Sequence, residues 1–149
     1  MSDVPLNRQQ LQVRLLESPF NAFLALEVVT VDPEKQEIVM RLKRRPEFER
    51  LAGTGQWHGG PIAAAIDIVG DYALAMLFGQ PLPTIDLRVD YLRPGKATLT
   101  LVARIRRSGK TVGVVDVDVL NEDGEPVAIG RANYSTAVDA SKSSEHLAR

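Results

Sequence analysis

One segment of the chain is apolar almost throughout. Residues 61–78 read PIAAAIDIVGDYALAMLF, and Asp67 and Asp71 are its only charged positions. Pro61 suits the first helical position and Gly79 suits the C-terminal cap, so the segment predicts a helix of about 27 Å. A helix that is apolar all round is buried on all sides in a globular protein. This segment is too short and carries too much charge to be predicted as a membrane span.

Strands are predicted on both sides of this helix. Val115, Val117 and Val119 alternate with Asp116 and Asp118, which indicates a strand with one buried and one exposed face. Short turns join several of the predicted strands, which favours antiparallel pairing. The predicted strands are 27–31, 36–43, 84–92, 98–107, 111–121 and 125–138.

These elements predict one α+β domain over residues 1–149. Residues 1–19 supply a short N-terminal helix that Asn7 caps, and the polar residues 139–149 are expected to be a disordered tail. A sheet that is apolar on one face must cover that face, and the long helix is the available cover. We therefore expect a curved antiparallel sheet wrapped around a central helix.

Composition narrows the classes of function. The chain has 149 residues with 18 Lys and Arg against 19 Asp and Glu, and its net charge of -1 gives no support to a nucleic-acid-binding surface. It has no cysteine, which excludes a cysteine-ligated metal, and its 2 histidines leave little for a histidine cluster. The N-terminus does not have the pattern of a signal peptide, so we expect a cytoplasmic protein.

The two acids of the apolar helix are candidates for chemistry. Asp67 and Asp71 are four residues apart and therefore share a helix face. Burying a carboxylate without a partner costs free energy or raises its pKa. One hypothesis is a general base or nucleophile in a groove along the helix. The other is that each acid caps a neighbouring loop or pairs with an arginine such as Arg88 or Arg93.

A glycine-rich loop leads directly into the helix, with the sequence Gly55-Gln56-Trp57-His58-Gly59-Gly60. A helix N-terminus presents free N–H groups, and glycines let a substrate carbonyl approach them closely. This chemistry is that of an oxyanion hole. The alternative is a tight loop whose glycines only satisfy backbone angles, with His58 bonded to a backbone carbonyl.

The spaced combination of His58-Gly59-Gly60 with Asp67 resembles the hotdog-fold acyl-CoA thioesterases, and among them the phenylacetic-acid-degradation (PaaI-like) branch. Residues 84–94, TIDLRVDYLRP, resemble the strand that follows the helix in that family. The resemblance implies a curved antiparallel sheet around one long helix, at about residues 59–78. It also implies homodimers or dimers of dimers, with active sites between subunits.

The resemblance also implies roles for particular residues. By position, Asp67 would activate water or attack the thioester, the Gly59 N–H would stabilise the oxyanion, and Thr84 would help to place the water. His58 would hold the loop. No metal or separate cofactor is implied, since coenzyme A is part of the substrate. The candidate substrate contacts are Gly60 and Gln56 beside the loop, and Arg106, Arg107 and Lys110 for the phosphates of coenzyme A.

Ala52 departs from the family pattern, because related enzymes often have Asn or Gln six residues before the histidine. The nearby Gln56 is a candidate substitute. The departure keeps open a second hypothesis, a non-catalytic acyl-CoA-binding hotdog protein. A third hypothesis, a hotdog dehydratase, would require an Asp/His pair, but His58 belongs to the glycine turn.

Overall fold

The computed structural model describes residues 1–138, and the predicted tail at 139–149 lies outside the described residues. Helices and strands follow one another in the order that the hydrophobic pattern predicted. The elements are α1 (Arg8–Glu17), α2 (Pro19–Leu24), β1 (Glu27–Asp32), β2 (Glu37–Leu42), a 3₁₀ turn (Pro46–Phe48), α3 (Gly59–Phe78), β3 (Thr84–Tyr91), β4 (Leu99–Ser108), β5 (Val112–Leu120) and β6 (Pro126–Ser135).

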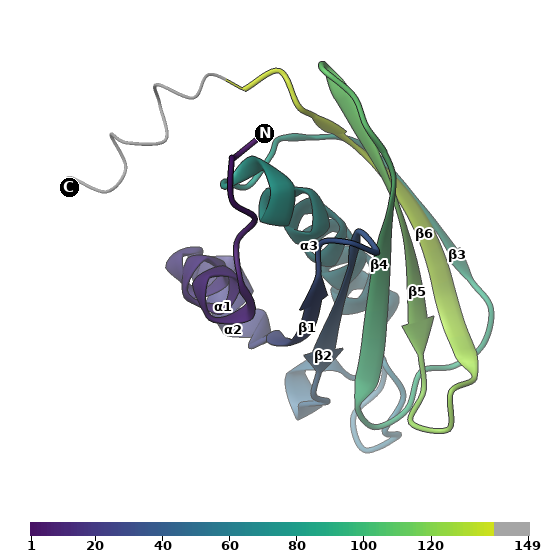
Figure 1. Cartoon of the computed structure of the whole chain (residues 1–149). Helices are drawn as coiled ribbons and strands as arrows, with labels where there is room; N and C mark the ends of the chain where they lie inside the picture. The colour runs from purple at the N-terminus through teal and green to yellow at the C-terminus, as the bar shows by residue number, and fades with distance from the viewer. Residues whose placement is uncertain (139–149) are drawn as a thin grey trace.

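The six strands form a single antiparallel sheet in the order β1-β2-β4-β5-β6-β3. The sheet curves around α3, which lies in its concave face, while α1 and α2 pack together beside β1 (Figure 1). The alternation predicted for β5 is confirmed, since Val115, Val117 and Val119 are buried toward α3. The predicted α+β architecture, a curved sheet around one central helix, is therefore confirmed.

The central helix covers residues 59–78, as the resemblance implied, and starts two residues earlier than Pro61, where the local sequence signals placed it. α3 begins at Gly59, because the side chain of His58 accepts a hydrogen bond from the Gly60 N–H and caps the helix. Pro61 is consequently the third helical residue and not the first. At the other end Gly79 adopts φ 79°, a left-handed conformation that favours glycine, and its N–H donates to the Ala75 carbonyl. The apolar character of α3 is explained by burial in the core of the domain.

The strand β3 is an exception to the burial pattern. Among residues 1–138 it pairs only with β6, and it forms one edge of the sheet. Two of its apolar side chains, Ile85 and Leu87, are 55% and 37% exposed. Tyr91 and Leu92, at the end of the strand, are 53% and 50% exposed. Part of the apolar face that the alternation in 84–92 creates is thus left uncovered by a single chain.

Candidate active site

The middle of α3 meets the start of β3 through two polar side chains. The hydroxyl of Thr84 donates a hydrogen bond of 2.8 Å to Oδ1 of Asp67. Asp67 is half-buried and Thr84 is exposed, so the pair lies at the surface of the single chain, where solvent can reach it. An accepting carboxylate beside a hydroxyl is an arrangement that can hold and deprotonate a water molecule. Two residues that the sequence singled out separately are thereby brought together.

Neither acid of α3 forms the ion pair that one hypothesis allowed. Arg88 lies against Asp90 of its own strand, with 3.3 Å between Nε and Oδ1. Arg93 donates from Nη1 to the Pro126 carbonyl at 2.7 Å. Asp67 is therefore a carboxylate whose described side-chain partner is a hydroxyl, which leaves its charge available for chemistry.

Tyr134 of β6 supports the backbone beneath Asp67. Its hydroxyl donates a 2.6 Å hydrogen bond to the Asp67 carbonyl, and the ring is fully buried. Burial raises the pKa of Tyr134, and the charges of Asp67 and Asp71 add to this effect, so the phenol stays a donor. The tyrosine passes so close to α3 that a methyl group on Gly70 would overlap its hydroxyl. No local sequence signal indicated Tyr134, because its role depends on packing between β6 and α3.

Asp71 caps a loop, as one of the two hypotheses allowed. Its Oδ1 accepts a hydrogen bond of 2.6 Å from the Leu82 N–H in the connection between α3 and β3. The pKa of Asp71 is raised to about 7, mainly because burial removes water from the carboxylate. The Leu82 N–H lowers this pKa and the negative charge of Asp67 raises it.

The N-terminus of α3 lies under an aromatic side chain. Nδ1 of His58 accepts from the Gly60 N–H at 2.9 Å, whereas the alternative for a structural histidine was a bond to a carbonyl. The hydroxyl of Tyr91 donates to the Gly59 carbonyl at 2.6 Å, and its ring lies 3.1 Å from the place a Cβ on Gly59 would take. Within residues 1–138 no acceptor takes the Gly59 N–H. One donor of the helix terminus is thus free to bind a ligand oxygen.

A pocket of about 400 Å³ opens beside Gly59. Gln56 lines it, so the structure places this candidate contact next to the helix terminus. Trp57 forms a wall and is fixed, since its Nε1 donates to the Ala97 carbonyl at 2.8 Å and its ring stacks on Phe48. Sequence reasoning missed the two basic residues of the pocket. The lining residues are Arg50, Gln56, Trp57, Gly59, Ile62, Tyr91, Leu92, Arg93, Pro94 and Gly95.

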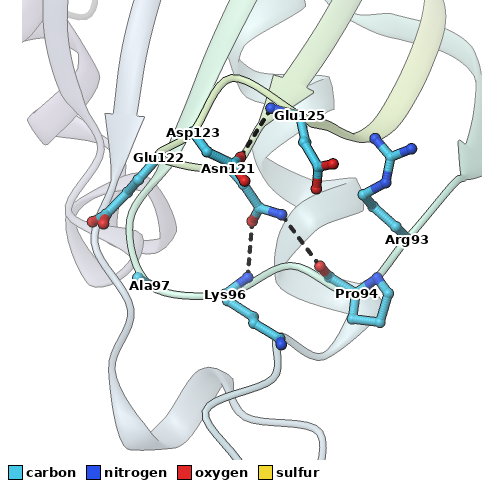
Figure 2. A pocket seen from close by; sticks show the side chains of 8 residues that line it. All are labelled: Arg93, Pro94, Lys96, Ala97, Asn121, Glu122, Asp123 and Glu125. Atoms are coloured by element: carbon cyan, nitrogen blue, oxygen red, sulfur yellow. Dashed lines mark hydrogen bonds between the residues drawn. The ribbon is translucent and has the colours of Figure 1, made fainter.

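A second pocket of about 390 Å³ adjoins the first and shares Arg93 and Pro94 with it (Figure 2). Asn121, which follows β5, connects to the segment before β4. Its Oδ1 accepts a hydrogen bond from the Lys96 N–H at 3.0 Å, and its Nδ2 donates to the Pro94 carbonyl at 3.4 Å. Acidic and basic side chains line this pocket together, so it has no single charge. Across residues 1–138, no group of three or more His, Asp or Glu side chains is placed to hold a metal ion.

The other predicted substrate contacts lie on the β4–β5 hairpin. Strand register places Thr84, Tyr134, Gly113 and Ser108 on one row across the sheet, so this hairpin is on the Thr84 side, with β5 two strands and β4 three strands from β3. A single chain therefore does not bring it to Gly59. Nε of Arg106 lies 3.4 Å from Oδ2 of Asp116, so Arg106 forms an ion pair within the sheet. The candidates on the hairpin are Arg106, Arg107 and Lys110.

The sequence around the site matches a known protein family. A family model described as the thioesterase superfamily matches residues 54–128, a segment that contains His58, Gly59, Asp67 and Thr84. The chain belongs to the thioesterase superfamily. The predicted enzyme class, a thioester hydrolase, and the PaaI-like resemblance are confirmed by this match and by the curated relatives.

Relatives of this thioesterase-superfamily chain include two from Escherichia coli strain K12. The medium/long-chain acyl-CoA thioesterase YigI is 30% identical over 138 residues, which cover 78% of this chain and 84% of YigI. The acyl-coenzyme A thioesterase PaaI is 29% identical over 110 residues, covering 72% and 75% of the two chains. A solved thioesterase-superfamily structure has 34% sequence identity and a TM-score of 0.80, and it covers 86% of this chain and 96% of its own. The hotdog fold is thereby confirmed.

Proposed function

We propose that this protein is an acyl-CoA thioesterase in which Asp67 activates water or attacks the thioester carbon. The net reaction converts an acyl-CoA and water into a carboxylic acid and free coenzyme A. The relatives YigI and PaaI, both named as acyl-CoA thioesterases, support the substrate class. The observation that carries the proposal is the hydrogen bond of 2.8 Å between Thr84 and Asp67, on the same helix whose N-terminus offers the free N–H of Gly59.

The oxyanion donor in this proposal is the backbone N–H of Gly59. The first N–H groups of a helix have no partner within the helix and carry partial positive charge. His58 accepts the N–H of Gly60, so the N–H of Gly59 is the helix-terminal donor left for a ligand oxygen. Tyr91 holds the Gly59 carbonyl and so fixes the peptide that follows this residue. In this proposal His58 and Tyr91 hold the peptide next to the donor and do not touch the thioester.

A single chain cannot place this donor and Asp67 on one thioester. The two residues are eight positions apart on α3, and a rise of about 1.5 Å per residue separates them by about 12 Å along the helix. A general base and an oxyanion donor must each lie about 3 Å from the reacting group. A second copy of the chain is therefore needed to complete the site.

The open edge of the sheet supports such a dimer. Long edge strands with exposed apolar side chains tend to pair, and β3 exposes Ile85 and Leu87. In a symmetric antiparallel pairing, the start of one β3 lies against the end of the other. Thr84 marks the Asp67 end of this strand, and Tyr91 marks the Gly59 end. The pairing would thus bring Asp67 of one subunit toward the partner's Gly59.

The coenzyme A part of the bound substrate would extend from this composite site along basic side chains. Arg50 and Arg93 line the pocket beside Gly59, and either can meet a phosphate. The hairpin with Arg106, Arg107 and Lys110 lies on the Thr84 side, about 14 Å from β3 at the usual spacing of strands. That hairpin belongs to the subunit that supplies Asp67, so its role in binding phosphates stays a prediction. A cytoplasmic location and a dimer or dimer of dimers are parts of the same proposal.

Hydrolysis and binding of a panel of short, long and aromatic acyl-CoAs test this function. Release of free thiol by the wild type supports the thioesterase. If the protein binds acyl-CoAs but releases no thiol from any of them, the thioesterase proposal is wrong. The alternative favoured by Ala52, a non-catalytic acyl-CoA-binding protein, would then take its place. Ala52 is exposed in the loop before Gln56, and its methyl group offers no hydrogen bond.

A further inference from the structure

The second acid of α3 has a partner in the segment that carries Thr84. Between α3 and β3 the chain reads Pro81-Leu82-Pro83-Thr84. Because proline has no N–H, Leu82 supplies the only backbone donor among residues 81–83. That donor is taken by Oδ1 of Asp71 at 2.6 Å. The one N–H of residues 81–83 therefore donates to a carboxylate of α3.

Two consecutive turns of α3 thus hold two neighbouring points of one segment. Asp71 holds Leu82, whose side chain is buried, and Asp67 holds Thr84 two residues later. The Pro83 carbonyl accepts a hydrogen bond of 2.8 Å from the Ser135 N–H, which fixes the segment to the end of β6. The position of the Thr84 hydroxyl consequently depends on Asp71 as well as on the sheet.

We propose that Asp71 is a positioning residue of the hydrolytic site, which holds Thr84 on Asp67 through the Leu82 N–H and adds its negative charge beside Asp67. The inference rests on the proposed thioesterase function. It assigns no contact between Asp71 and the substrate. It differs from a purely structural cap because the charge of Asp71, and not only its acceptor oxygen, takes part.

The surroundings of Asp71 contain no compensating cation among the described residues. On its own helix the facing charge is Asp67, from β6 the facing group is the Tyr134 phenol, and from the α3–β3 connection it is the Leu82 N–H. The next residue, Tyr72, directs its hydroxyl to the Arg14 carbonyl of α1. Burial and Asp67 raise the pKa of Asp71 to about 7, so its charge changes in the neutral range.

Ionisation of Asp71 has a definite sign of effect on the reaction. A negative charge favours the arrival of a proton nearby, so ionised Asp71 favours removal of a proton from the water at the Thr84–Asp67 pair one turn away. Ionised Asp71 also accepts the Leu82 N–H more strongly, since charge-assisted hydrogen bonds are stronger than neutral ones. We therefore expect kcat of the wild type to rise as the pH increases from 6 to 8, through the titration near 7.

The substitution Asp71→Asn separates the charge from the acceptor. The amide keeps an oxygen for the Leu82 N–H but cannot ionise. We expect this variant to lose the rise in kcat near neutral pH and to have kcat about threefold to tenfold below the wild type at pH 8, with KM nearly unchanged. Asp71→Ala removes the acceptor as well, and displacement of Thr84 by about 1 Å would lower kcat by roughly 10²-fold.

Asp32→Asn is the matched control, since Oδ1 of Asp32 accepts the Lys35 N–H at 3.0 Å in the distant β1–β2 turn. It makes the same chemical change and should leave the profile unchanged. A profile of Asp71→Asn that superimposes on that of the wild type would overturn the inference while the thioesterase function stands. Failure of the wild type to release thiol from any acyl-CoA would overturn the proposed function and this inference with it. Thermal unfolding of each variant identifies a loss of rate that is due to misfolding.

Discussion

Oδ1 of Asp67 accepts a hydrogen bond of 2.8 Å from the hydroxyl of Thr84, seventeen residues later in the chain. The bond joins the middle of the buried helix to the first residue of the edge strand β3. A carboxylate on a buried helix would otherwise be without a hydrogen-bonding side chain, and a hydroxyl at the start of an edge strand would face solvent. Their meeting defines the point where a nucleophilic water is expected to lie.

Thr84→Ala should slow hydrolysis without unfolding the protein. The hydroxyl is exposed, so its removal creates no cavity, but it deletes a hydrogen bond to a charged group. Such bonds contribute roughly 1.5–3 kcal/mol, which corresponds to a decrease in kcat of about 10-fold to 100-fold. Thr84→Ser keeps the hydroxyl and should retain most of the rate. Equal rates for the alanine variant and the wild type would remove Thr84 from the mechanism.

Gly59→Pro offers a way to delete a backbone donor. Proline suits the first position of a helix, and His58, with φ -68° and ψ 142°, already has the extended conformation that a following proline requires. Loss of one oxyanion donor should lower kcat by roughly 10²–10³-fold. Gly59→Ala is the control, because it adds a Cβ near the Tyr91 ring but keeps the N–H. If both variants lose activity equally, crowding and not the donor is responsible.

Mixing two inactive variants tests the composite site. A dimer of one Asp67→Asn subunit and one Gly59→Pro subunit has one site with both defects and one site with neither. Random pairing after co-refolding should therefore restore about a quarter of the wild-type activity. Activity of the mixture that stays at the level of the separate variants would show that each site is formed within one chain.

Gly70→Ala should destabilise the fold through Tyr134. The added methyl group would overlap the Tyr134 hydroxyl, which donates to the Asp67 carbonyl. Overpacking of this kind costs about 1–3 kcal/mol, which urea unfolding can measure. Tyr134→Phe removes the hydroxyl and should recover part of the loss when it is combined with Gly70→Ala. An additive double variant would show that the two residues do not compete for this space.

The stability of the folded protein should depend on Asp71 in the neutral pH range. The pKa of Asp71 is raised from 3.8 to about 7 on folding, so the folded state binds more protons than the unfolded state between these values. Stability therefore falls as the pH rises from about 4 to about 7, by at most roughly 4 kcal/mol from this group.

Asp71→Asn removes this dependence and should unfold at higher urea than the wild type at pH 8, with little difference at pH 4. Asp32 provides the opposite sign, because the Lys35 N–H lowers its pKa, so its contribution is present above pH 4 and is lost in acid. A wild type and an Asp71→Asn variant with parallel stability curves would show that Asp71 does not change its charge in this range.

The sequence was sufficient for features that depend on periodicity. The apolar run that ends at Phe78 has only two charged side chains to present to water, so the burial of most of it followed directly from its composition. The alternation of Val115, Val117 and Val119 with polar residues predicted one apolar face of the sheet, and the helix was the element available to cover that face. These are interactions that many similar side chains share, and they do not depend on the position of any one atom.

The sequence was insufficient where one side chain meets one distant backbone group. His58 caps α3 from outside the apolar run, so the helix starts two residues before Pro61, which the local pattern marked as its first position. Tyr91 reaches the Gly59 carbonyl, and Asp71 reaches the Leu82 N–H, only because the fold brings these segments together. Arg50 and Arg93 were missed as pocket residues for the same reason.

Free-thiol release by the wild type and by Asp67→Asn, measured side by side on the acyl-CoA panel, tests the proposed chemistry most directly. The amide has nearly the same shape and can still accept the Thr84 hydroxyl, but it cannot act as a base or nucleophile. We predict turnover by the wild type and a decrease in kcat of about 10²–10⁴-fold in a variant with an unchanged thermal transition. Undiminished turnover by Asp67→Asn, or none by the wild type on any acyl-CoA, would contradict the assignment of Asp67 as the catalytic residue.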